Sequence, residues 1–278
     1  MSEENITLDP EYKELIIEVN KLKDRVAEKI AERDMLAFHV IPEIENRYMM
    51  KIGILENDAF NANLRLLRIA RKVELYKEKI KQNIEFTEKE IERQLDNEFE
   101  NIEDEYNDLQ EELMFDVENA HTDEIAAEFL KVLNIIYKNL IKKLSPLINF
   151  DNGRLENQLY ELLEKAYREL DASMMSKLQN ICEQVRPDSS LIIGDMKSLE
   201  RAKKKYIELI EENEDIILNI KCSELFEKKR ILENESLTRR TKEEINVDII
   251  QIEEKILELE KELKKLQGET DNEINSDN

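Results

Sequence analysis

The sequence predicts an all-α fold, in which long antiparallel coiled-coil helices flank a small helical head. Of the 278 residues only four are Gly and four are Pro, whereas 38% are charged and 6% are aromatic. A sheet protein needs turn residues about every ten positions, and this chain has too few. The apolar content of 41% recurs at helical spacing, which disfavours general disorder.

An N-terminal helix is expected within residues 1–41, from about Asp9 to about Phe38. Asp9 suits the helix cap and Pro10 suits the first turn. Pro42 is expected to break the helix at a packed, apolar corner. The residues of its apolar stripe recur at spacings of three and four and are Tyr12, Leu15, Val19, Leu22 and Val26.

A long coiled-coil helix is expected in residues 42–122. Apolar residues alternate at spacings of three and four over positions 52–80 and again over 91–113, which is typical of a coiled-coil seam. The pattern weakens over positions 83–87, but no Pro or Gly interrupts it there. At ~1.5 Å per residue, positions 52–117 would form a rod of about 100 Å.

The C-terminal coiled-coil arm is expected in residues 188–267. A bend is predicted near Ser223, because positions 216–221 lack a clear heptad phase. Residues 268–278 are polar and acidic, and a disordered tail is expected there. The clearest heptad of the chain consists of Ile245, Ile249, Ile252, Ile256, Leu259, Leu263 and Leu266.

Charge predicts an antiparallel pairing of the two arms. Between Glu85 and Asp123 there are sixteen acidic residues and two basic ones, which should repel one another along one helix. Folding residues 196–266 back on residues 52–117 would bring basic clusters beside this run. The alternative is an acidic face that is simply solvated. The expected neighbours are Arg201, Lys203, Lys204 and Lys205 beside positions 103–112, and Lys228, Lys229 and Arg230 beside Glu85 and Glu88.

The helical head, residues 123–187, differs from the arms in composition. Acidic and basic residues balance in it, and aliphatic residues are denser. Ser145-Pro146 ends its first helix. The expected helices cover 123–144, 155–170 and 172–185.

The head resembles a J (DnaJ-type) domain. Residues 137–147, Tyr-Lys-Asn-Leu-Ile-Lys-Lys-Leu-Ser-Pro-Leu, resemble the second helix and loop of that domain, and residues 155–170 resemble its third helix. Outside the head, residues 32–39 and 47–53 resemble bacterial coiled-coil proteins that carry a J-like domain between helical arms. This resemblance spans most of the chain and implies a chaperone-related protein.

The motif that gives J domains their activity is altered. J domains stimulate ATP hydrolysis by DnaK-type chaperones through a His-Pro-Asp tripeptide, and the loop here reads Ser145-Pro146-Leu147. Leu147 cannot make the charge-assisted contacts of an aspartate. The resemblance therefore implies a J-like scaffold that has lost co-chaperone activity. What remains for a partner is a weak basic face of Lys138, Lys142 and Lys143.

The sequence does not favour an enzyme, and no catalytic residue, metal or cofactor is expected. Of the two histidines, His39 lies in the apolar corner and is expected to be packed, and His121 precedes a helix start. No glycine-rich phosphate loop occurs. Glu88, Glu92 and Asp96 share a helix face and could hold a hard cation weakly, but a solvated face is the preferred interpretation.

Protein partners are expected: a DnaK-type chaperone or the subunits of an assembly. The net charge of −23 disfavours nucleic acid and anionic membranes. The polar N-terminus is unlike a signal peptide, no membrane span is seen, and Cys182 and Cys222 suit reduced thiols, so a cytoplasmic location is expected. The expected function is that of a non-catalytic scaffold or adaptor, and the alternative is an active J-domain co-chaperone. An oligomer is compatible with the sequence.

Overall fold

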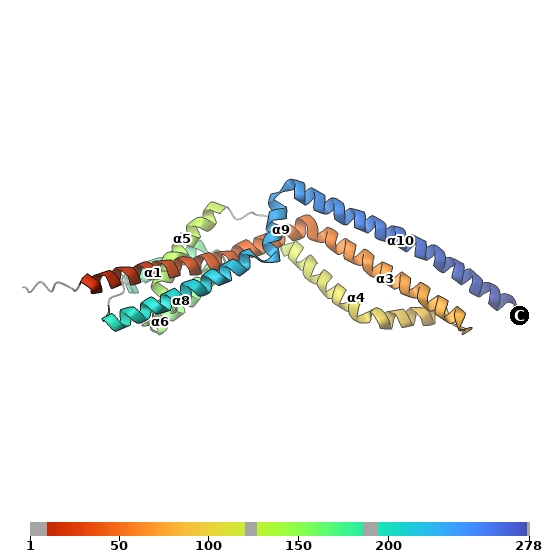
Figure 1. Ribbon diagram of the computed structural model, residues 1–278, viewed down its shortest axis with the longest axis horizontal. Coiled ribbons are helices and arrows are strands. Elements are labelled where there is room, and N and C mark those ends of the chain that lie inside the picture. The colour runs from red at the N-terminus through yellow and green to blue at the C-terminus, as the bar shows by residue number, and fades with distance from the viewer. Residues whose placement is uncertain (1–9, 120–126, 186–193, 277–278) are drawn as a thin grey trace, which may run out of the picture. The chain divides into compact units, whose positions relative to one another are not determined.

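The computed structural model describes residues 10–119, 127–185 and 194–276, and over these ranges the chain forms helices and turns without any strand. The predicted all-α class is confirmed. Two compact units divide the chain: unit 1 comprises residues 1–44 and 121–227, and unit 2 comprises residues 45–120 and 228–278 (Figure 1). The elements are α1 (Pro10–Met35), the π-helix η1 (Leu36–Val40), α2 (Ile41–Tyr48), the π-helix η2 (Met49–Gly53), α3 (Ile54–Lys81), α4 (Glu88–Asn119), α5 (Ala127–Leu144), α6 (Arg154–Arg168), α7 (Ala172–Val185), α8 (Met196–Lys221), α9 (Glu224–Glu233) and α10 (Glu235–Ser276).

Unit 1 is built on a parallel pair of helices, α1 and α8. The Tyr12 hydroxyl donates to the carbonyl oxygen of Gly194 at 2.7 Å, just before α8 begins. Further along, Lys203 pairs with Glu18 at 2.8 Å, and Lys221 pairs with Glu32 at 2.7 Å. Residue numbers rise together in both helices, so the two run in the same direction. Figure 1 shows them side by side.

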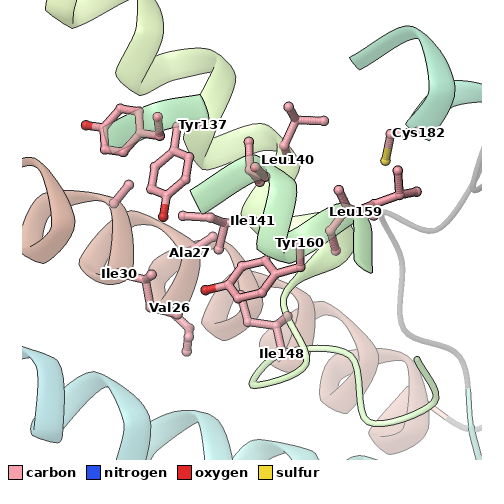
Figure 2. Packing of buried hydrophobic residues seen from close by; sticks show 14 of the residues in the cluster. Val26, Ala27, Ile30, Tyr137, Leu140, Ile141, Ile148, Leu159, Tyr160 and Cys182 are labelled. Atoms are coloured by element: carbon pink, nitrogen blue, oxygen red, sulfur yellow. The ribbon is translucent and has the colours of Figure 1, made fainter. Parts of the chain in front are cut away.

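The core of the expected head is continuous with that of α1 and α8. Tyr137 and Ile141 of α5 are fully buried in the same cluster as Ile30 of α1 and Tyr206 of α8. Figure 2 shows residues of α1, α5 and α6 converging in this core. Because α5 packs directly on α1, the helices of the expected head share one core with α1 and α8.

Unit 2 contains a second parallel pair, α3 and α10. Arg65 pairs with Glu253 at 2.8 Å, and Lys77 pairs with Glu262 at 2.8 Å, so residue numbers again rise together. The heptad face of α10 is buried or half-buried, as predicted, and it packs on α3 through Ile252, Ile256, Leu259, Leu263 and Leu266. The predicted antiparallel direction is wrong, because a heptad seam alone carries no information on direction.

The expected rod over positions 52–117 is broken between α3 and α4. Asn83 has a φ of 51°, in the left-handed region that commonly ends helices. Thr87 then begins α4 with a capping box: its hydroxyl accepts from the Glu90 amide, and the Glu90 carboxylate accepts from the Thr87 amide at 2.9 Å. Both signals are present in the sequence at the point where the heptad pattern weakens.

The acidic run of α4 finds its partners on α3 rather than on the C-terminal arm. Arg68 pairs with Glu92 at 3.2 Å, with Glu103 at 2.9 Å and with Asp96, so its guanidinium forms ion pairs with three carboxylates. Arg71 pairs with Glu98 at 2.8 Å. The charge pairing predicted for Arg201 to Lys205 and for Lys228 to Arg230 is thus replaced by a local one. The sharp turn before α4 makes this possible.

Replacing Arg68 with Ala is expected to lower the free energy of unfolding of unit 2 by about 1–2 kcal/mol, because three neighbouring carboxylates lose their shared cation. Its side chain is 27% exposed. The matched control is Arg65→Ala, which removes one pair whose arginine is 55% exposed and should cost at most about 1 kcal/mol. Urea unfolding followed by circular dichroism measures both. Equal losses in the two variants would contradict the special role of Arg68.

Pro42 does not interrupt the helical path, since α1, η1 and α2 follow one another directly. The Ile41 amide donates to the carbonyl of Leu36, five residues earlier, so η1 makes one wide turn just before the proline. This turn relieves the clash of the proline ring with the preceding turn and allows α2 to follow directly. The prediction of a packed corner is confirmed for His39, which is buried.

The predicted bend near Ser223 is confirmed, since α8 ends at Lys221 and α9 begins at Glu224. The Ser223 hydroxyl donates to the Ile220 carbonyl at 2.7 Å and so closes the end of α8. The tail prediction is wrong in part, because α10 extends to Ser276. Gly268 lies in open space within this helix.

Candidate functional site

The loop between α5 and α6 carries the sequence motif singled out above. α5 ends at Leu144, where Pro146 predicted its end. The backbone turns sharply there, because the Ser145 carbonyl accepts from the amides of Ile148 at 3.1 Å and Asn149 at 2.8 Å. The Gly153 amide then donates to the Glu156 carboxylate at 3.1 Å and starts α6.

The three residues of the altered tripeptide differ in accessibility. Ser145 is 0% exposed, whereas Leu147 is 41% exposed and Pro146 is also at the surface. The Ser145 hydroxyl accepts from the Leu147 amide at 3.3 Å, so it is used within the turn. The first position of the tripeptide is therefore closed to a partner, and the second and third positions are open.

Side chains from α1 and α8 hold the loop in place. The Lys23 ammonium of α1 donates to Asn149 Oδ1 at 2.9 Å, although Lys23 is only 2% exposed. The Tyr206 hydroxyl of α8 donates to the Ile148 carbonyl at 2.7 Å. Asn149 in turn donates to the carbonyls of Lys142 and Ser145 at 3.2 and 3.1 Å. Buried groups joined in this way fix a single conformation of the loop.

The basic face predicted on α5 is partly used within the chain. Lys142 pairs with Asp24 of α1, and its side chain is 24% exposed. Lys138 and Lys143 are half-buried. Since one of the three lysines is already neutralised, the face available to a partner is weaker than the sequence suggested.

A second polar cluster lies where α1 meets α5. Asp34 is 2% exposed; it accepts from the Tyr137 hydroxyl at 2.9 Å and pairs with Arg33 at 2.6 Å. The Arg33 guanidinium also donates to Asn213 of α8 at 3.1 Å, which joins three helices through one carboxylate. Burial, with the nearby Asp34 charge, raises the pKa of Tyr137 well above its usual range, so its hydroxyl remains a donor.

Aromatic stacking extends this cluster to η1. The rings of Tyr137 and Tyr167 stack with centroids 3.7 Å apart, and His39 meets Tyr167 edge-on at 4.7 Å. Burial lowers the pKa of His39, although a hydrogen bond to the Tyr167 backbone opposes this shift. His39 is thus packed between η1 and α6 and does not lie in an open cleft.

The sequence interpretation missed Asp34, although a signal was present. Asp34 follows the buried positions Ala27 and Ile30 at helical spacing, which places it on the inner face of α1. A carboxylate on such a face requires a partner. Its partner Tyr137 is remote in sequence, as is Asn213, which binds the neighbouring Arg33, so neither could be named.

The remaining candidate residues are the acidic face of α4, the second histidine and the two cysteines. Glu88 and Glu92 both pair with Lys72, and Arg68 holds Asp96, so the proposed cation face is occupied by basic side chains. Within the described ranges, no three His, Cys, Asp or Glu residues are grouped so as to hold a metal. His121 lies outside the described residues. No disulfide joins the two cysteines; Cys182 is buried and Cys222 is exposed.

Comparison with known proteins gives no assignment, since no family model, curated protein or solved structure matches this chain. Among the helices that the structure describes, none has both the length and the apolar character required to cross a bilayer.

Proposed function

We propose that this chain is a non-catalytic scaffold or adaptor of the cytoplasm, in which residues 123–187 form a degenerate J-like domain, and that it acts as a subunit of a larger assembly. The resemblance of residues 137–147 and 155–170 to J domains motivates the first part. The antiparallel helices α5 and α6, joined by a loop that contains Pro146, are compatible with it.

The burial of Ser145 is the observation that carries the proposal. An active J domain needs an imidazole at this position that can reach the chaperone. Here the side chain is 0% exposed and its hydroxyl is used within the turn. Asp24 also neutralises Lys142, one of the cations that would face a chaperone. Both features support a scaffold over the alternative, an active co-chaperone.

The two helix pairs support a role in protein binding. Parallel pairing of α1 with α8 and of α3 with α10 produces long surfaces whose outward residues are largely charged. The chain carries a net charge of −23, which repels phosphate backbones and anionic lipid. A protein partner is the class that such surfaces suit best.

The chain is expected to leave chaperone ATPase activity unchanged, because the loop lacks both reactive side chains. The measurement is single-turnover ATP hydrolysis by the DnaK-type chaperone of the same host, with an intact J protein of that host as the positive control. A stimulation of several fold that is abolished by Pro146→Ala would establish the co-chaperone alternative instead.

The assembly part of the proposal has a separate test. Mass photometry of the tagged chain, purified gently from its host, should show a species well above the 33.0 kDa mass of one chain. The same chain made alone serves as the reference for self-association. A monomer in both preparations would contradict the assembly.

A further inference from the structure

The surroundings of His39 are unusual for a titratable group. The residue is 4% exposed and lies in the π-helical turn η1. Its Nε2 atom is buried and has no hydrogen-bond partner among the residues that the structure describes. The ring edge rests against Tyr167 of α6, whose hydroxyl donates to Asn134 of α5 at 3.0 Å. His39 thus connects the segment that follows α1 to the α5–α6 pair.

The charged groups near this joint are engaged elsewhere. On α1, Asp34 is bound by Arg33 and Tyr137. On α6, the Arg168 guanidinium lies over the Phe38 ring at 4.5 Å and adds positive charge beside the histidine. The other polar and charged groups on the helices around η1 are Tyr137 and Asn134 on α5, Glu164 on α6, the Glu32–Lys221 pair between α1 and α8, and Asn213 and Glu214 on α8.

We propose that His39 is an acid-sensitive latch, whose protonation releases the α5–α6 pair from η1 within unit 1. A proton on Nε2 would create a buried imidazolium with no acceptor for its new N–H. Opening of the joint gives that charge access to water. The wide turn of η1 has π-helical hydrogen bonds in place of the α-helical pattern, which makes it a suitable place for local opening.

The direction of the pH dependence follows from proton binding. The pKa of His39 is lowered in the closed joint, whereas an exposed histidine in the open joint has its ordinary value of about 6.5. The open form therefore binds more protons below about pH 6.5, so the closed form loses stability as the pH falls. Each pH unit in this range raises the opening constant by up to about tenfold.

Hydrogen–deuterium exchange of the intact chain at pH 7.5 and 5.5 tests the latch. After correction for intrinsic exchange rates, the opening constant of α6 amides should rise at the lower pH, by at most about tenfold. In His39→Phe, which keeps an aromatic ring without a titratable nitrogen, the rise should vanish. His121→Gln is the matched control and should behave as the wild type. Amides of α3 and α10, in unit 2, serve as an internal reference.

A second measurement needs no variant. Nuclear magnetic resonance of the imidazole Cε1–H groups follows both histidines of the wild type, and His121→Gln assigns them. An ordinary pKa for His39, or an unchanged acid response in a folded His39→Phe chain, would overturn the latch. If His39→Phe does not fold, a lowered pKa for His39 together with increased α6 exchange at pH 5.5 supports it, and the lack of either rejects it.

Discussion

Replacing Asp34 with Ala is expected to destabilise unit 1 by about 3–5 kcal/mol, because it leaves buried partners unpaired. Asp34 is 2% exposed and binds both Arg33 and the Tyr137 hydroxyl. Without the carboxylate, Arg33 keeps Asn213 as an acceptor but loses its ion pair, and the buried Tyr137 hydroxyl loses the acceptor that it has in the wild type. Urea unfolding, followed by the near-ultraviolet circular dichroism of the tyrosines, measures the loss.

The matched control for this experiment is Asp24→Ala, on the same helix. Asp24 is 59% exposed and its partner is Lys142, so its removal should cost at most about 1 kcal/mol. Tyr137→Phe removes only the donor and should cost about 1.5–3 kcal/mol, which keeps the effect measurable if the Ala variant does not fold. Similar losses of unfolding free energy in the Asp34 and Asp24 variants would show that the buried carboxylate stabilises unit 1 no more than an exposed one does.

Replacing both Ile252 and Leu259 with Asp is expected to unfold the α3–α10 pair, at a cost of about 4–5 kcal/mol or more. Ile252 is 8% exposed and packs in a cluster with Ala62, and Leu259 packs against the cluster that contains Val73. Two unpaired carboxylates cannot be accommodated in this seam. Thermal unfolding at 222 nm should show an early transition in the variant.

The outer face of α10 provides a control with the same change in charge. Ile250 and Leu257 are 58% and 53% exposed, so replacing both with Asp should change the stability by at most about 1 kcal/mol. Both double variants add the same negative charge, so a difference in their stability reports the effect of burial alone. Equal unfolding temperatures for the two would show that the predicted stripe does not carry the packing.

Periodicity predicted which faces of the helices are buried, and it did so well. The heptad from Ile245 to Leu266 lies against α3, and α7 has the expected limits of residues 172–185. Direction was not predictable in this way, because a seam of Ile and Leu fits a parallel or an antiparallel partner. The charge argument then chose wrongly, since it treated α3 and α4 as one helix and so removed Arg68 and Arg71 from consideration.

The candidate site was less accessible from sequence than the fold. Pro146 located the loop, but its conformation depends on the contacts of Lys23 with Asn149 and of Tyr206 with Ile148, and both partners are remote along the chain. The sequence around a lysine such as Lys23 on an amphipathic helix does not indicate which residue the lysine binds. The helix-ending effect of proline therefore located the loop, whereas the burial of its first residue, Ser145, could be seen only from the tertiary packing.

Parallel pairing within one chain also has a consequence for protein synthesis. Hydrogen-bonded partners on α1 and α8, or on α3 and α10, are 180 to 191 positions apart. At about 5–20 residues per second, a ribosome needs about 10–40 s to supply the second helix after the first. In that interval α3 can pair only with α4, whose contacts span 16 to 35 positions. The α3–α4 hairpin is thus expected to form on the ribosome first, covering part of α3 until α10 emerges.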